Sequence, residues 1–123
     1  MPQEASKHDL ITASRVDGTP IFNREGDRIG HVKDLSINKQ TGQVIYALIS
    51  FGGFLGIGEE LHPIPWSMLD YETDKAGYIV PLNKDDLEKA PSLTPEQLEE
   101  LGAGEAWRAR IYDFYGPYGV APL

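Results

Sequence analysis

The chain contains no cysteine. A disulfide scaffold, a thiol nucleophile, an iron–sulfur cluster and a thiolate zinc site are therefore excluded. A domain without disulfides depends on an ordinary hydrophobic core, and 123 residues are enough to form one. With 41% hydrophobic and 24% charged residues, the composition is that of one globular domain.

Basic residues are scarce. Lys and Arg total 11 against 19 Asp and Glu, which gives a formal net charge of -8. A chain this acidic repels the phosphate backbone of nucleic acids and the headgroups of anionic lipids. We therefore expect protein partners and no direct nucleic-acid partner.

Long apolar runs are also missing. The longest mostly apolar stretch, Val44 to Ile57, is interrupted by Ser50 and three glycines, and a membrane-spanning helix needs about 20 residues. The first residues lack the basic and apolar segments of a secretory signal. We therefore predict no membrane insertion and a cytoplasmic location.

Turn-forming residues and short apolar runs alternate over residues 13–82, after a polar, unpatterned segment that we interpret as a mobile N-terminal arm, residues 1–12. The runs predict six strands: Pro20 to Asn23, Arg28 to Ile37, Gln43 to Phe51, Leu61 to Trp66, Met68 to Glu72 and Tyr78 to Leu82. Six short strands at this spacing are typical of a small antiparallel β-barrel. The predicted fold class is therefore mainly β, with short C-terminal helices.

Two predicted strands carry further detail. Val32 and Leu35 are three residues apart, which breaks the period of two and predicts a β-bulge near Lys33-Asp34. In the third strand, Gln43 to Phe51, apolar residues occupy both faces, whereas a strand wet on one side would alternate. We therefore expect the C-terminal segment or another chain to cover its outer face.

Residues 83–123 form a predicted helical, aromatic C-terminal extension. Asn83 predicts the cap of a short helix over Lys84 to Lys89, and Thr94 predicts the cap of a second helix that ends at Gly102. The following tail carries apolar residues at i, i+4, i+7 and i+8, which predicts an amphipathic helix. These residues are Trp107, Ile111, Phe114 and Tyr115.

Several short motifs lie along the chain. They are Val16-Asp17-Gly18, Gly26 to Gly30 leading into Val32 to Leu35, Gly42 to Tyr46, the glycine loop Phe51 to Gly58, and His62 to Trp66. Together, from about Leu10 to Leu82, they resemble the PRC-barrel domain family, and Ile111 to Gly116 looks like the tail of its stand-alone bacterial members. The resemblance implies a six-stranded barrel like those of the photosynthetic reaction-centre H subunit and the ribosome maturation factor. In those settings the barrel is an interaction module, so the resemblance implies a general class of function and leaves the partner open.

The glycine loop does not have the pattern of a phosphate-binding loop. Its glycine order differs from a dinucleotide fingerprint, and no Lys-Ser/Thr pair follows as in a P-loop. We interpret it as a flexible hairpin or lid. The candidate lid residues are Gly52, Gly53, Gly56 and Gly58.

The titratable residues give no sign of a catalytic or metal site. His8, His31 and His62 have no metal-ligand spacing, and the last two would meet only if their side chains shared one face of a sheet. The carboxylates adjoin turns, as turn chemistry favours, and Asp34 at the predicted bulge is the one to examine. We predict no catalytic residue, no metal and no cofactor.

The aromatic tail is the strongest indication of function. Its candidate interface residues are Trp107, Ile111, Tyr112, Phe114, Tyr115 and Tyr118. Such side chains either fold back over the barrel or anchor a protein interface. We predict a non-enzymatic interaction domain that self-associates through the tail or the third strand, as a homodimer.

Two alternatives stay open. One is a small-molecule or metal-binding regulatory module, with the glycine loop as a lid and His62 or Asp34 as polar contacts. The other, from the resemblance alone, is an assembly factor associated with the ribosome or a photosynthetic complex.

Overall fold

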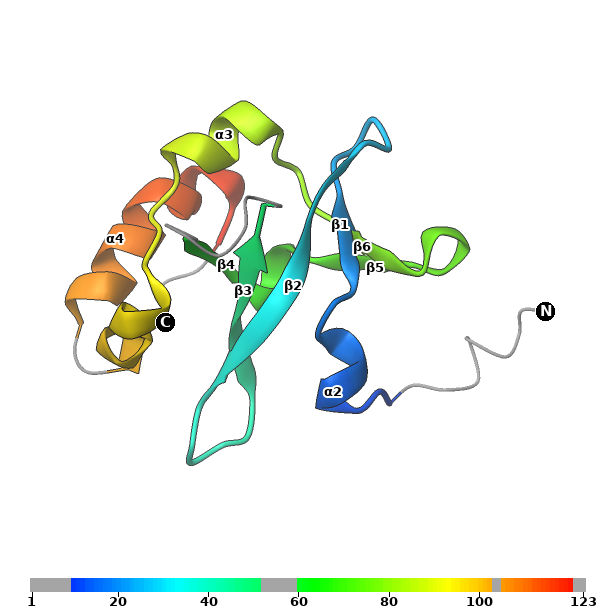
Figure 1. Cartoon of the computed structure of the whole chain (residues 1–123). Helices are drawn as coiled ribbons and strands as arrows, with labels where there is room; N and C mark the ends of the chain where they lie inside the picture. The colour runs from blue at the N-terminus through cyan, green and yellow to red at the C-terminus, as the bar shows by residue number, and fades with distance from the viewer. Residues whose placement is uncertain (1–9, 52–59, 103–104, 121–123) are drawn as a thin grey trace.

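The computed structural model describes residues 10–51, 60–102 and 105–120 (Figure 1). This part of the chain forms strands followed by short helices. In chain order, the elements are α2 (Ala13–Val16), β1 (Pro20–Phe22), β2 (Arg28–Ile37), β3 (Val44–Ser50), β4 (Leu61–Pro65), η1 (Trp66–Met68), β5 (Asp70–Glu72), η2 (Thr73–Lys75), β6 (Gly77–Ile79), α3 (Lys84–Lys89), η3 (Pro95–Gly102), α4 (Ala106–Tyr115) and η4 (Gly116–Tyr118).

The six strands form one sheet in the order β4-β3-β2-β1-β6-β5. Neighbouring strands pair antiparallel, except that β1 and β6 run parallel through Ile21–Tyr78 and Phe22–Ile79. The prediction of a mainly β fold with six strands is confirmed, and the prediction of a wholly antiparallel sheet is wrong. The reason is that β4 and β5 are joined through η1 and not by a hairpin, so both strands run in the same direction in the sheet. The next strand, β6, therefore runs parallel to β1.

The sheet is strongly curled but not closed by hydrogen bonds. β4 and β5 are its two outer strands, and five Cα steps from Pro65 to Asp70 span at most about 18 Å. The outer strands of a flat six-stranded sheet would be about 24 Å apart, so the sheet must bend to bring its edges together. Within the described ranges no strand ladder joins β4 to β5. The predicted barrel is therefore corrected to an open, curled sheet.

The bulge predicted in the second strand is confirmed. The register of β2 against β3 shifts between Val32 and Asp34, which leaves Lys33 as the extra residue. Just before the bulge, Gly30 lies so close to β3 that an added Cβ would collide with the carbonyl oxygen of Ser50. The close approach of the two backbones therefore explains this glycine.

Some predicted elements differ in length or type. Met68 lies in η1, whose turn is closed by the N–H of Leu69 donating to the carbonyl of Trp66 at 3.0 Å, so the fifth strand begins only at Asp70. The helix after Thr94 is a 3-10 helix, although the Gln97 side chain does accept the N–H of Thr94 as an N-terminal cap. One helical turn, α2, was not predicted; it buries Val16 against the core.

The predicted helix over Lys84–Lys89 is confirmed as α3. Asn83 caps it: its Oδ1 accepts the N–H of Asp86 at 2.9 Å, and Asp86 Oδ2 accepts the N–H of Asn83 at 3.0 Å. This reciprocal arrangement satisfies two backbone donors that the helix start would otherwise leave free.

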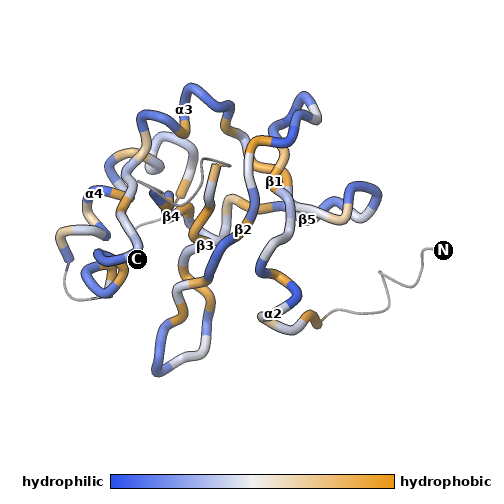
Figure 2. Tube along the Cα trace, viewed as in Figure 1, coloured by the Kyte–Doolittle hydropathy of each residue, from blue (hydrophilic) through white to orange (hydrophobic). Residues whose placement is uncertain are grey.

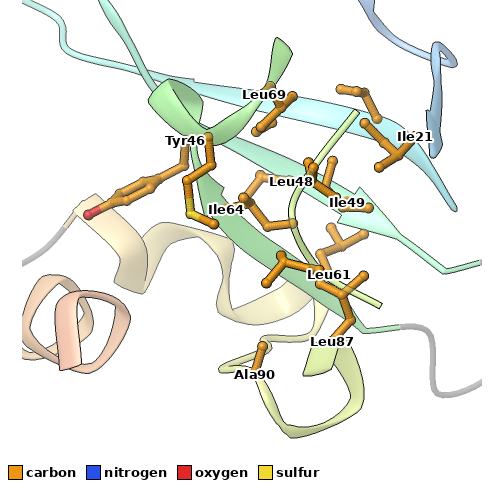
Figure 3. Close-up of a cluster of buried hydrophobic side chains, with 14 of the residues drawn as sticks. Ile21, Tyr46, Leu48, Ile49, Leu61, Ile64, Leu69, Leu87 and Ala90 are labelled. Carbon is orange, nitrogen blue, oxygen red and sulfur yellow. The ribbon is translucent and has the colours of Figure 1, made fainter. Parts of the chain in front are cut away.

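The C-terminal extension packs on the sheet, with α4 in contact with β4 (Figure 1). Its buried residues Leu87, Leu93 and Leu101 belong to the same hydrophobic core as the strands. Figure 3 shows Leu87 and Ala90 beside Leu61 of β4. Figure 2 shows hydrophilic residues in the turns and in much of the helical extension, and hydrophobic residues in stretches of the strands. One core therefore joins the sheet and the extension.

Within residues 10–51, 60–102 and 105–120, no helix has the length and apolar character needed to cross a membrane.

Candidate functional site

Helix α4 holds the tail against its own chain. Trp107, Ile111 and Tyr115 face the core and are 8%, 2% and 0% exposed. They lie at i, i+4 and i+8, so they form one stripe along the helix. These three candidate interface residues are therefore covered within a single chain.

The other three candidates reach the surface. Tyr112 and Tyr118 are 40% and 39% exposed, and Phe114 is half-buried. We call Tyr112, Phe114 and Tyr118 the tail surface. Large aromatic side chains that stay accessible after folding are favoured anchors of protein interfaces.

Ring contacts order the tail surface. The rings of Phe114 and Tyr118 are stacked with centroids 6.5 Å apart, and Tyr115 meets Phe114 edge-on at 4.9 Å. Tyr115 also lies 6.1 Å from Tyr118. Phe114 and Tyr118 are thus packed against a buried ring, which fixes their positions before any partner binds.

The hydroxyl of Tyr115 is buried and finds no hydrogen-bond partner among the described residues. Burial strongly raises the pKa of this tyrosine, and Tyr118 and Asp86 act in the same direction. The hydroxyl therefore stays protonated, and Tyr115 functions as a core residue.

Trp107 contacts two charged residues, Arg110 on α4 and Glu100 on η3. The guanidinium of Arg110 lies over its ring at 4.2 Å, and its Nε1 donates a hydrogen bond of 3.3 Å to Glu100 Oε1. A cation on an indole face is a favourable contact. Arg110 is therefore directed back toward the body of its own chain.

Strand β3 is covered on both faces, as its sequence predicts. Tyr46 and Leu48 on one face and Ala47 and Ile49 on the other are all buried within one chain. Burial raises the pKa of the Tyr46 hydroxyl, and the nearby charge of Arg108 on α4 partly opposes this shift. The C-terminal helix thus lies close to β3.

The outer edge of β4 is closed by prolines and by the extension. Leu61 donates its N–H away from β3, to the carbonyl of Leu93 at 2.8 Å. Since N–H groups alternate along a strand, positions 63 and 65 would point to the same side, and both are proline. This edge therefore offers no free donor with which a second strand could pair.

The two strand histidines do not meet. His31 pairs with Ser50 and His62 pairs with Ile49, and neighbouring residues of β3 point to opposite faces. In the part of the chain that the structure describes, no group of three or more His, Asp or Glu side chains is placed to hold a metal.

His62 is a buried histidine of the β4 region. Its Nδ1 has no partner among the described residues, and its ring lies 4.7 Å from that of Phe51. Burial lowers its pKa, which the Glu60 carboxylate and the Pro91 carbonyl partly offset. This environment favours a neutral ring that packs as a core residue.

Asp34 has a structural role at the bulge, where it accepts a backbone hydrogen bond. Its exposed carboxylate accepts the N–H of Leu35 at 2.8 Å, which satisfies a backbone donor where the ladder is interrupted. The candidate lid residues Gly52, Gly53, Gly56 and Gly58 lie outside the described residues.

A shallow groove of about 430 Å³ lies between the β1–β2 turn and the start of α3. It is lined by Asn23, Asp27, Arg28, Ile29, Asn83, Lys84 and Asp85. The side-chain oxygen of Asn23 is already used by the N–H of Asp27, and that of Asn83 caps α3. With two cations and two carboxylates, the groove presents no dominant charge to a ligand.

The fold and the site define a small β domain with an aromatic helical extension. Residues 8–87 match the PRC-barrel domain. Because this match covers well over half of the chain, the chain belongs to the PRC-barrel family, as its motifs predicted. The matched region contains the whole sheet and α2, whereas α4 and the tail surface lie beyond it.

A protein of Deinococcus radiodurans, described as uncharacterized, is similar to the chain. The two sequences are 27% identical over 96 residues. The similarity covers 78% of this chain and 31% of that protein, so the chain spans about a third of its relative's length.

Proposed function

We propose that this PRC-barrel chain is a protein-interaction domain without catalytic chemistry of its own, and that it self-associates as a homodimer through the tail surface. One observation carries the proposal: after α4 has buried Trp107, Ile111 and Tyr115, the tail still presents Tyr112, Tyr118 and part of Phe114. These rings stay accessible after folding, and tyrosine is favoured at interfaces.

The surroundings of the tail support this choice of surface. β3 is buried on both faces, and the outer edge of β4 lacks free donors, so neither offers a second copy a ready contact. The third strand, which the sequence made a candidate for self-association, is covered by its own chain. Of the two surfaces that the sequence marked, the tail surface is therefore the one we propose.

A solution mass measurement with matched variants tests the proposal. We expect the full chain to be a dimer by light scattering, and Tyr112→Ala/Tyr118→Ala to be a folded monomer. The control is Tyr71→Ala: Tyr71 is 50% exposed on β5, which lies on the opposite side of the molecule from α4 (Figure 1). The control should remain dimeric.

Two results would contradict the proposal. One is a wild-type chain that is monomeric at every concentration. The other is a double variant with the same mass as the wild type, which would place the contact elsewhere. A circular dichroism spectrum and a thermal midpoint close to wild type establish that the double variant is folded.

A further inference from the structure

The outer side of α4 carries a regular pattern that the core-facing stripe does not use. With Trp107, Ile111 and Tyr115 buried, the exposed side and flanks of the helix present residues spaced three and four apart. These are Glu105, Arg108, Ala109, Tyr112, Asp113 and Gly116, all of them exposed except the half-exposed Gly116.

This spacing fits a heptad pattern. Glu105 and Tyr112 take the d positions, Ala109 and Gly116 take the a positions, and the flanks are Arg108 at g and Asp113 at e. In a parallel pair of helices, a g residue faces the e residue five positions further along the partner. Arg108 and Asp113 are five positions apart and opposite in charge.

We propose that two copies of the chain pair in parallel along this outer stripe of α4, with Arg108 of each copy bound to Asp113 of the other. The inference rests on the proposed self-association and names its geometry. The a and d residues, which we call the seam, then include Tyr112 of the tail surface, and Tyr118 lies beyond their C-terminal end because η4 follows α4 directly.

The charges of Arg108 and Asp113 favour the parallel orientation. In an antiparallel two-fold pair each flank of the helix meets the same flank of its partner, so g faces g and e faces e. Arg108 would then oppose Arg108, and Asp113 would oppose Asp113. Like charges at an interface disfavour that arrangement, whereas the parallel one pairs opposite charges on both sides.

The seam residues allow two helices to approach closely. Ala109 is small, and the Tyr112 ring lies over Gly116, about 3.4 Å from where a Cβ would be. The Tyr112 ring therefore lies along the stripe and fills the hollow at Gly116. Arg110 is held on the Trp107 ring at 4.2 Å, so it does not compete with Arg108 for Asp113 of the second copy.

Two features limit the strength of the pair. α4 has 10 residues and is therefore about 15 Å long, which is a short seam. Its first d position is Glu105, which would oppose itself in a parallel pair. We therefore expect a reversible dimer with a dissociation constant on the order of micromolar.

Cysteine cross-linking tests the register directly, because the chain has no cysteine of its own. In a parallel pair, a and d residues meet their own copies, at a separation a disulfide can bridge. We expect Ala109→Cys to form a covalent dimer on mild oxidation. The matched control Arg110→Cys, one residue further on and directed toward Trp107, should cross-link far less at the same protein concentration.

Charge exchange tests the Arg108–Asp113 pair. Arg108→Asp and Asp113→Arg should each weaken the dimer by about tenfold, because each creates like-charge contacts. The double variant Arg108→Asp/Asp113→Arg should restore dimerisation to within about threefold of wild type. Both substitutions are at exposed positions, and thermal midpoints of the three variants near the wild-type value check the fold.

The outcomes separate this inference from the proposed function. If the wild type is a dimer but Ala109→Cys cross-links no better than Arg110→Cys, or the double charge variant fails to recover, the parallel α4 pairing is wrong and self-association through other residues stands. If the wild type is a monomer at every concentration, both are wrong.

Discussion

Leu61 and Leu93 exchange two backbone hydrogen bonds, 2.8 Å from Leu61 N to Leu93 O and 2.9 Å from Leu93 N to Leu61 O. This pair attaches the C-terminal extension to the outer edge of β4. A hydrogen bond from the Ser92 hydroxyl to the Glu60 carboxylate lies beside it. The extension is therefore hydrogen-bonded to the edge of the sheet, and we expect the sheet and the extension to unfold together.

Removing the largest side chain that anchors α4 tests this coupling. Trp107→Ala deletes a buried ring, and core truncations of this size cost about 3–5 kcal/mol in the free energy of unfolding. We expect one cooperative transition at lower urea concentration by circular dichroism. Arg110→Ala is the control, since it removes only the cation on the ring, worth about 0.5–1 kcal/mol. Two separate transitions in the Trp107 variant would show that the extension folds independently.

Gly30 is predicted to tolerate no side chain. A Cβ there would collide with the Ser50 carbonyl oxygen across the β2–β3 ladder. Gly30→Ala should therefore lower the free energy of unfolding by roughly 2–4 kcal/mol, measured by urea titration. Gly102→Ala is the matched control, because no described atom lies within 4 Å of its Cβ position. Equal effects of the two substitutions would contradict the close approach of β2 and β3.

The cap of α3 gives a smaller, local prediction. Asn83→Ala removes the acceptor of the Asp86 N–H and should cost about 1 kcal/mol in the free energy of unfolding. Lys84→Ala, at the exposed first position of the helix, should be nearly neutral. Faster hydrogen exchange of the Asp86 amide in the Asn83 variant would identify the lost cap as the cause.

His62 predicts a pH dependence of stability. Burial lowers its pKa in the folded chain below the ordinary value of 6.5. Between the two pKa values the unfolded chain binds more protons than the folded one, so stability should fall as the pH drops below about 6.5. His62→Leu should flatten the profile of the free energy of unfolding between about pH 7 and 5.5. An identical slope in both proteins would show that His62 is not the group responsible.

Much of the local structure could be predicted from the sequence. The bulge at Lys33 followed from a three-residue step between apolar residues, and α3 followed from Asn83 and the residues after it. The core stripe of α4 followed from helical periodicity. Each is encoded within a few neighbouring residues, so a local pattern is enough to find it.

The long-range features could not be predicted in the same way. Alternation in β1 and β6 shows which residues are buried but not that Ile21 pairs in parallel with Tyr78. Nor does a pattern reveal that the Leu61 N–H is taken by Leu93, 32 positions away. The same limit applies to the tail: its spacing and aromatic content indicated six candidates, and only the packed structure separates buried Tyr115 from exposed Tyr118.

The solution molar mass of the full wild-type chain, measured by light scattering over a range of concentrations, is the most direct test of self-association. We expect a rise from 13.6 kDa toward twice that mass as the concentration passes the micromolar range. A mass that stays at 13.6 kDa at every concentration would contradict it.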